Sequence, residues 1–108
     1  KMTKTIALVK NVCFVGHTHL PSIINGQAQY FEPDKVEYKY KYQGIKLIIN
    51  VGSVGQPRDG NNKASYVEWK DPEIFFHRVQ YDIDAVCAKI KNNPELDDFL
   101  GERLWEGR

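Results

Sequence analysis

The sequence predicts an α+β fold in which most strands are antiparallel. Residues 36–42 alternate between apolar or aromatic and charged side chains, which is the period of a strand with one buried face. Residues 64–70 and 73–81 are typical of the two arms of a β-hairpin, with Asp71-Pro72 at its turn. After position 82 the apolar residues recur at helical spacing instead. Strands therefore dominate the middle of the chain, and helices close it.

The first part of the chain predicts a helix and two strands. Three apolar side chains near the start have the spacing of one helical face, namely Met2, Ile6 and Val9. Asn11 ends this helix, and the apolar residues 12–15 predict the first strand. Residues from Pro21 onward are expected to form a connection, which leads to a short strand over 27–31 and a turn over 32–35.

Two further strands are expected before a glycine-rich loop. In the alternating strand over 36–42, one face carries Val36, Tyr38, Tyr40 and Tyr42. Gly44 turns the chain into a second apolar strand over 46–51. The loop over 52–60 follows it, and the hairpin comes next.

Two helices are expected at the end of the chain. Asp82 is placed to cap the first, whose apolar face holds Ile83, Val86, Cys87 and Ile90. Asn92 and the residues after it end this helix. Pro94 suits the first position of the last helix, which is expected to continue to about Trp105.

Composition restricts the class of protein. The 108 residues are enough for one domain with a modest core, and 42% of them are hydrophobic. With 15 basic and 14 acidic residues, the net charge of +1 indicates neither disorder nor a nucleic-acid partner. No apolar run approaches the roughly 18–20 residues of a membrane span, and none near the start suits a secretion signal. Cys13 and Cys87 show no pairing pattern, which predicts reduced thiols and a cytoplasmic protein.

The most informative motif directly follows the first predicted strand and reads Gly16-His17-Thr18-His19. Open α/β sheets usually place ligand-binding residues at the carboxyl ends of their strands. Side chains two positions apart point the same way on an extended chain, and a turn can direct them toward two neighbouring ions. Neutral imidazole is a good ligand for zinc, manganese and iron. The alternative is a pair of surface histidines without a metal.

The loop over 52–60 is the second candidate part of a site. Asn50 and Ser53 lie at the end of a strand that is expected to neighbour the one before the histidines. Both are candidates to orient a metal-binding imidazole through a hydrogen bond. Arg58 is a candidate for a bidentate contact with the phosphate of a substrate, and Ser53 is placed with it at the substrate. The alternative is ordinary turn chemistry, with Arg58 paired to Asp59 or to another surface carboxylate.

Together, the segments FVGHTHLP and INVGSVGQPRDG resemble the carboxyl-terminal half of calcineurin-like metallophosphoesterases, above all the small prokaryotic phosphatases and phosphodiesterases. The likeness covers residues 12–67, and residues 99–108 resemble the tail of that subfamily. One departure is Val51, where the loop of the family usually has a proline. Gly52 still supplies the turn there.

The resemblance implies the β-rich half of a four-layer α/β/β/α metallophosphoesterase sandwich, with carboxyl-terminal helices. Residues 1–108 are then the carboxyl-terminal part of a single domain, because the upstream Asp-x-His and Gly-Asn-His motifs of the family do not occur in the chain. The amino-terminal half becomes a partner, in cis or in trans. The face that it covers is expected to be exposed and apolar, which favours homo-oligomers or poor solubility of the isolated chain.

The resemblance also implies metal-dependent phosphoester hydrolysis, by a phosphomonoesterase or a phosphodiesterase. His17 is expected to bind one and His19 the other of two divalent transition-metal ions, which are manganese, zinc, iron or nickel. Such paired ions neutralise the phosphoryl oxygens during in-line attack. The substrate is a small-molecule phosphoester or a phosphoprotein. The complete protein is then an enzyme and this chain alone is inactive; the alternative is a non-catalytic binding or assembly module that retains the fold.

Three further residues receive structural predictions. Gly16 is expected to allow a close approach of the backbone to the site, so that a branched side chain there distorts it. Thr18 is expected to fix its loop through its hydroxyl. His77 shares one face of a strand with two apolar side chains, which favours a half-buried structural histidine over a metal ligand.

Overall fold

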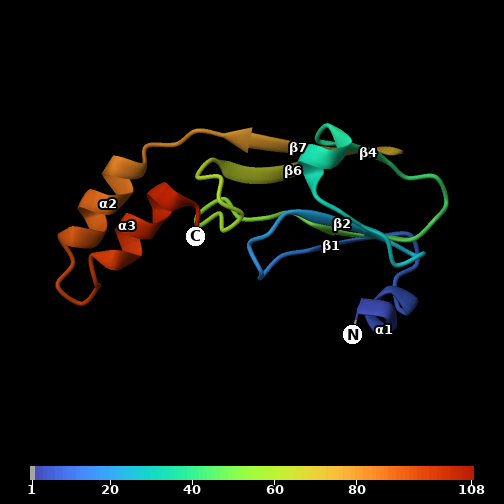
Figure 1. Cartoon of the computed structure of the whole chain (residues 1–108), viewed down its shortest axis with the longest axis horizontal. Coiled ribbons are helices and arrows are strands. Elements are labelled where there is room, and N and C mark those ends of the chain that lie inside the picture. Colours follow the sequence, from blue (N-terminus) through green and yellow to red (C-terminus); the bar gives the residue numbers. More distant parts are fainter. Residues whose placement is uncertain (1) are drawn as a thin grey trace.

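The computed structural model describes residues 2–108, with side chains described from residue 5 onward. The chain forms two facing β-sheets, with a short helix at one end and two longer helices at the other (Figure 1). Four strands form the larger sheet in the order β1-β5-β2-β3, and three form the smaller sheet in the order β4-β7-β6. The predicted α+β class, with mostly antiparallel strands, is confirmed.

The larger sheet is organised around β5 (Leu47–Asn50), in which all four residues are buried. On one side β5 pairs in parallel with β1 (Val12–Val15). On the other side it pairs antiparallel with β2 (Ser22–Asn25), which in turn pairs with β3 (Tyr30–Phe31). A continuous apolar run suits such a central strand, because both of its faces are covered.

The smaller sheet contains the predicted hairpin, formed by β6 (Ala64–Lys70) and β7 (Glu73–Val79). A short third strand, β4 (Lys39–Lys41), pairs with the other side of β7. Ile74 and Phe76 of β7 point to the buried face. The neighbouring residues of the strand point to the other face and are less buried.

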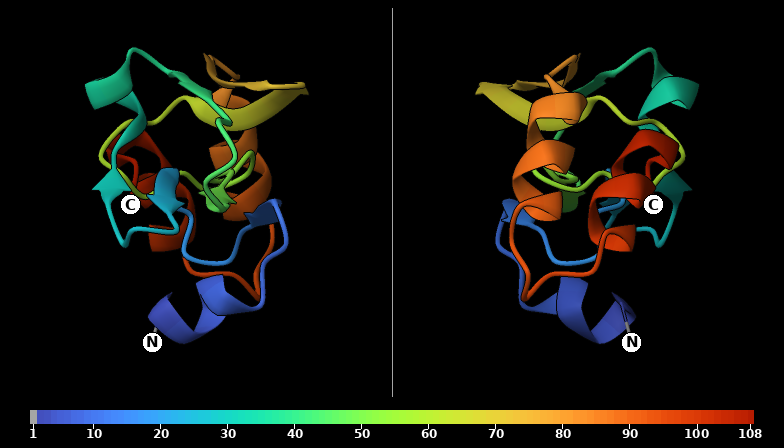
Figure 2. Two further views of the ribbon diagram at one scale, coloured as in Figure 1. Left: turned by 90° about the vertical axis from the view of Figure 1, so that its right-hand side faces the viewer. Right: turned by 90° about the vertical axis from the view of Figure 1, so that its left-hand side faces the viewer.

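One hydrophobic core lies between the two sheets. Its buried members are Ile23, Leu47, Ile49, Ile74 and Phe76. The opposite face of the larger sheet is covered near Ile48 by α1 (Met2–Ala7) and the residues after it. The order of layers is therefore α1, larger sheet, core, smaller sheet (Figure 2).

The last two helices, α2 (Ile83–Lys91) and α3 (Phe99–Glu106), pack on each other and extend beyond the sheets (Figure 1). The predicted cap is confirmed, because the Asp82 carboxylate accepts a hydrogen bond from the N–H of Ala85 at 3.0 Å. Within the described residues, no helix has the length and apolar character needed to cross a membrane.

The predicted start of the last helix at Pro94 is wrong. The side chain of Asn93 accepts from the N–H of Glu95, and that of Asp97 accepts from the N–H of Phe99, each at 3.0 Å. These local hydrogen bonds stabilise turns that compete with helix, so α3 begins only at Phe99.

The predicted connection after Pro21 is also wrong, because residues 22–25 form β2. The strand predicted over 27–31 is reduced to the two residues of β3. The side-chain oxygen of Asn25 accepts from the N–H groups of Gln27 and Gln29, each at 3.0 Å, and so holds residues 25–29 in a turn.

Only part of the strand predicted over 36–42 forms. Residues 33–36 make a single 3-10 turn, η1 (Pro33–Val36). Glu37 and Tyr38 then have φ values of 58° and 63°, which lie in the left-handed region and exclude a strand. The strand is therefore limited to β4, and Tyr38 is exposed instead of lying on the buried face.

Replacing Ile49 with alanine tests the role of β5. Ile49 is fully buried in the core, so Ile49→Ala is expected to lower the free energy of unfolding by about 2–5 kcal/mol. Val54→Ala is the control, because Val54 is 67% exposed and its truncation changes stability by less than about 0.5 kcal/mol. Urea unfolding measures both, and equal effects would contradict the central place of β5.

Candidate functional site

Two loops meet at one edge of the larger sheet. Residues 16–20 follow β1, and residues 51–60 follow β5. Because β1 and β5 are parallel, their carboxyl ends lie at the same edge, as the sequence predicted for these neighbours. A hydrogen bond of 3.3 Å from the N–H of Arg58 to the carbonyl of His19 joins the two loops directly.

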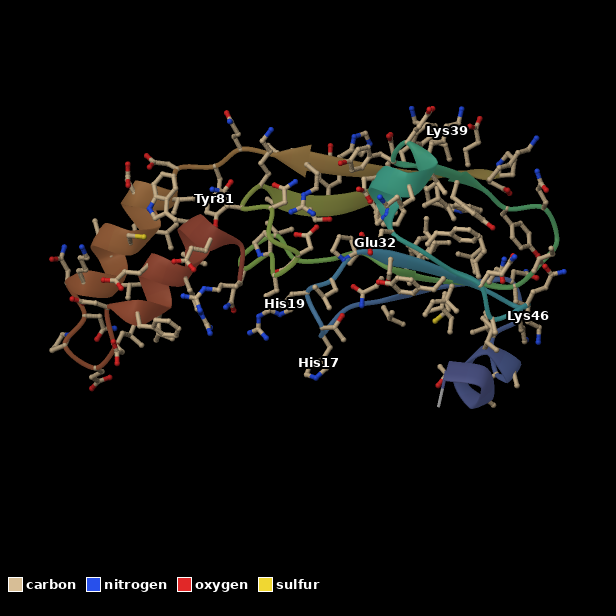
Figure 3. The ribbon with its side chains drawn as sticks, viewed as in Figure 1. His17, His19, Glu32, Lys39, Lys46 and Tyr81 are labelled. Atoms are coloured by element: carbon tan, nitrogen blue, oxygen red, sulfur yellow. The ribbon has the colours of Figure 1, made fainter. Side chains whose placement is uncertain are left out.

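Both candidate metal ligands have strained backbones. The φ values are 85° for His17 and 63° for His19, in the left-handed region that residues other than glycine rarely adopt. Figure 3 shows both imidazoles leaving the same loop at the outer edge of the larger sheet. His17 is exposed, and its ring has no hydrogen-bond partner among the described residues; His19 is half-buried. The strain is consistent with a loop shaped for a function.

The carbonyl of Gln56 holds the imidazole of His19. The distance from His19 Nδ1 to this oxygen is 2.7 Å. Gln56 lies in the loop after β5, so the contact spans the two loops. No residue pattern predicts this contact, because a backbone carbonyl is present at every position and carries no signal in the residue type.

Asn50 joins the two loops to each other. The prediction that its side chain bonds to an imidazole is wrong. Its side-chain amide donates to the Thr18 hydroxyl at 2.9 Å and to the Gly16 carbonyl at 3.4 Å. Its side-chain oxygen accepts from the N–H of Gly52 at 3.0 Å. Asn50 itself is buried, whereas its partners Gly16 and Thr18 are exposed. The prediction that the hydroxyl of Thr18 fixes the loop is confirmed.

The hydroxyl of Ser53 accepts from the N–H of Gln56 at 2.8 Å and so closes a turn in the second loop. The guanidinium of Arg58 is exposed and donates to the side-chain oxygen of Gln56 at 3.1 Å. Of the alternatives, ordinary turn chemistry is present at Ser53, whereas the pairing of Arg58 with Asp59 is wrong, because Asp59 pairs with Arg78. Ser53 and Arg58 thus border the two histidines, and their contact with substrate stays a prediction.

A buried arginine anchors the end of the second loop. Arg78 of β7 makes a bidentate contact with Asp59, at 2.7 and 3.1 Å, and its side chain is only 10% exposed. It also donates to the carbonyls of Asn61 and Lys63, at 2.9 and 2.7 Å. A planar guanidinium can satisfy several acceptors at once, which a lysine cannot do. The partners are 15 to 19 residues away in sequence, so no local pattern predicted them.

The end of the chain supports the same loop. The N–H of Gly60 donates to the carbonyl of Gly107 at 3.0 Å, and the side-chain amide of Gln56 donates to the carbonyl of Arg108 at 3.3 Å. Gly107 has a φ of 68°, and a Cβ there would lie 2.7 Å from the N atom of Asn61. A glycine is therefore required where α3 ends against the loop.

The two site glycines differ in what they require. A Cβ at Gly16 would meet no atom of this chain within 4 Å, so the close approach of its backbone to the site stays a prediction. Gly52 has a φ of 77°, and a Cβ there would lie 2.7 Å from the hydroxyl oxygen of Ser65. The turn predicted at Gly52 therefore requires glycine, both for its conformation and for its space.

His77 has the structural surroundings predicted for it. It is half-buried on β7, its ring stacks on Tyr66 with centroids 4.8 Å apart, and its Nε2 lies 3.1 Å from the carboxylate of Glu68. This hydrogen bond lowers the pKa of Glu68. A cross-strand contact of this kind stabilises the hairpin and gives no reason to assign a metal.

A cavity of about 380 Å³ opens between the sheets, beside the two loops. Leu20 and Asp59 belong to its wall, next to His19 and Arg58 in the chain. Arg78 and Asp59 of its lining are paired with each other, and the remaining charged groups are the carboxylates of Glu32 and Asp34. Unpaired carboxylates repel an anion, so this cavity does not suit a phosphate group.

The two histidines are too few to hold a metal ion alone. Among the described residues, no group of three or more histidine, cysteine or acidic side chains is arranged to bind one. Protein zinc sites usually use three or four protein ligands. Two accessible imidazoles on one loop nevertheless fit transition-metal ions by their chemistry, provided that further ligands come from outside this set.

Comparison with known proteins relates the whole chain to part of a longer protein. No protein-family model matches it. The uncharacterized protein MJ0912 of Methanocaldococcus jannaschii is 44% identical over 101 residues, which are 91% of this chain and 40% of the relative. The crystal structure of a metallophosphoesterase from Sphaerobacter thermophilus matches with a TM-score of 0.84 and 34% identity, over 94% of this chain and 44% of that one. The chain thus spans less than half the length of either relative, and its resemblance to metallophosphoesterases is confirmed.

Substituting the two glycines separately tests the geometry of the site. Gly52→Ala is expected to lower the free energy of unfolding by more than about 1–2 kcal/mol, because it adds a left-handed alanine and a clash with Ser65. Gly16→Ala is the matched control and is expected to change it by less than about 0.5 kcal/mol. Urea unfolding measures both variants; a Gly52→Ala protein as stable as the wild type would refute this description of the loop.

Proposed function

We propose that this chain, which matches part of a metallophosphoesterase in fold and sequence, contributes His17 and His19 to a dinuclear metal centre that hydrolyses phosphoesters. One observation carries the proposal. The two imidazoles project from a strained loop at the shared carboxyl end of β1 and β5, beside a second loop that bears an exposed arginine. In the calcineurin-like resemblance, each histidine serves one ion.

The residues of the chain have separate tasks in this reaction. Bound divalent ions supply Lewis-acid stabilisation of the charge that develops on the phosphoryl oxygens. His17 and His19 hold these ions as neutral donors, which leaves more of the positive charge for the substrate than carboxylates would. Arg58 presents parallel N–H donors to a phosphate oxygen pair, and Ser53 lies beside it. Asn50 and Gly52 keep the two loops in register.

The remaining ligands come from the rest of the longer polypeptide, in the same chain or as a separate one. Strands β1 and β6 are edge strands on the same side of the molecule (Figure 2). The rings of Phe14 in β1 and Trp69 in β6 pack edge to face, with their centroids 6.2 Å apart. Phe14 is 42% exposed and Trp69 is 41% exposed. Open edges with exposed aromatic rings favour pairing with further strands, which would complete the four-layer sandwich.

A non-catalytic binding or assembly module is the second candidate. It is favoured by the incomplete metal group of the described residues. The two candidates differ upstream of this chain: an enzyme requires Asp-x-His and Gly-Asn-His motifs there, and a module does not.

The substrate class of the enzyme is a small-molecule phosphoester or a phosphoprotein. The two cysteines of this chain, Cys13 and Cys87, are free thiols, which supports the proposal that the protein is located in the reducing cytoplasm.

Alanine substitutions of the histidines test the enzyme. In the full-length protein with manganese, His17→Ala and His19→Ala are each expected to lower the hydrolysis of p-nitrophenyl phosphate and its diester by more than about 100-fold, because a metal ligand is lost. His77→Ala is the control and is expected to keep the activity. Native mass spectrometry counts the bound ions, with two in the wild type and fewer in the variants. Unchanged activity in both variants would refute the proposal.

Self-association of the 108-residue chain tests the open edges. The double variant Phe14→Ser, Trp69→Ser is expected to weaken association by more than about tenfold, since truncating one aromatic anchor costs about 2 kcal/mol. Leu8→Ser with Val54→Ser is the control, because these residues are more exposed but lie elsewhere. Sedimentation velocity over a range of concentrations measures both, and a monomeric wild type would contradict the expectation.

A further inference from the structure

Gln56 uses all four of its polar groups at the junction of the two loops. Its N–H donates to the Ser53 hydroxyl at 2.8 Å, and its carbonyl lies 2.7 Å from His19 Nδ1. Its side-chain oxygen accepts from Arg58 at 3.1 Å, and its side-chain nitrogen donates to the carbonyl of Arg108 at 3.3 Å. One residue therefore contacts a proposed metal ligand, a proposed phosphate ligand and the segment after the last helix.

The contact with His19 decides which ring nitrogen is available. A carbonyl oxygen only accepts hydrogen bonds, so Nδ1 must carry the proton in the pair with Gln56. In a neutral imidazole Nε2 then keeps its lone pair, which is the form that binds a metal through Nε2. In this way the carbonyl selects the tautomer before any ion arrives.

The carbonyl of Gln56 is itself held from several sides. The next residue, Pro57, is fully buried, and a residue that precedes proline is restricted to extended conformations. The side-chain amide has one satisfactory orientation, because exchanging its oxygen and nitrogen would place donor against donor at Arg58 and acceptor against acceptor at Arg108. The side chain thus restrains the backbone that holds the imidazole.

We infer that Gln56 is a positioning residue: its carbonyl sets the tautomer and direction of His19, and its side chain ties that carbonyl to Arg58 and to Arg108, two residues after α3. The inference rests on the proposed function, in which His19 binds a metal ion. It adds that the contact of the segment after α3 with the second loop contributes to metal affinity, although that segment supplies no ligand.

Nitrogen-15 NMR of the imidazoles tests the inference on the metal-free 108-residue chain. The spectra are recorded at about pH 8, above the ordinary pKa of about 6.5 for imidazole, and protonated and unprotonated nitrogens give separate resonances. In the wild type, His19 is expected in the Nδ1–H form. In Gln56→Ala, a mixture of the two tautomers is expected. Asn62→Ala is the matched control, because the Asn62 amide also bonds to the end of α3, at the Trp105 carbonyl, without touching His19.

A zinc titration of the full-length protein, as wild type and with each of the two substitutions, adds a binding readout, because the other ligands of the proposed centre come from outside this chain. Gln56→Ala is expected to bind zinc at His19 about tenfold more weakly, at the lower end of the effect of removing a group that orients a ligand. Asn62→Ala is expected to bind as the wild type does. Amide spectra establish that each variant is folded.

The outcomes separate this inference from the proposed function. A wild-type His19 with its proton on Nε2 overturns the inference, even if Gln56→Ala does not fold. An equal loss of the Nδ1–H form in Gln56→Ala and Asn62→Ala also overturns it, because the effect would then be general loosening of the loop. If the tautomers are as expected but the full-length protein shows no metal-dependent hydrolysis, the positioning role stands and the proposed function fails.

Discussion

The parallel pairing of β1 with β5 is the contact on which the fold and the candidate site both depend. Within the larger sheet it brings the ends of two strands, more than thirty residues apart in sequence, to one edge. An antiparallel pair would place the two loops at opposite edges, and the histidines would then lie far from Arg58. The same strand organises the interior, because Ile49 of β5 enters the core while Ile48 faces the residues after α1.

The site combines local strain with extensive support. Left-handed backbones at His17 and His19 cost about 1–3 kcal/mol each. The hydrogen bonds of Asn50 to the first loop and of Gln56 to His19 offset this cost, and both come from the strand and loop that neighbour β1. Their own positions are fixed by burial and by the Arg78–Asp59 pair. The strain of the first loop is therefore offset by residues of β5 and of the loop that follows it.

The features that the sequence predicted correctly are those with a repeated or local signal. The β6–β7 hairpin, the cap of α2 and the apolar β5 belong to this group. The prediction of a strand over 36–42 was wrong because the alternation of side chains carries no information on the left-handed conformation of Tyr38. The contact with Gln56 and the anchoring by Arg78 were missed because they join distant segments, one of them through a backbone atom. Residue types thus predicted which two loops form the candidate site, whereas the contacts that support these loops emerged only from the packing.

The distribution of support within the chain bears on how a complete site could assemble. His19 and Arg58 are held here by hydrogen bonds to Gln56, whose side chain also bonds to Arg108 just after α3. Under the proposed function, a partner that pairs with β1 and β6 would meet ligands whose directions are already set. The entropy of ordering those side chains is then lost during folding and not during metal binding, which strengthens the assembled centre. An incomplete set of ligands can in this way be a well-organised one.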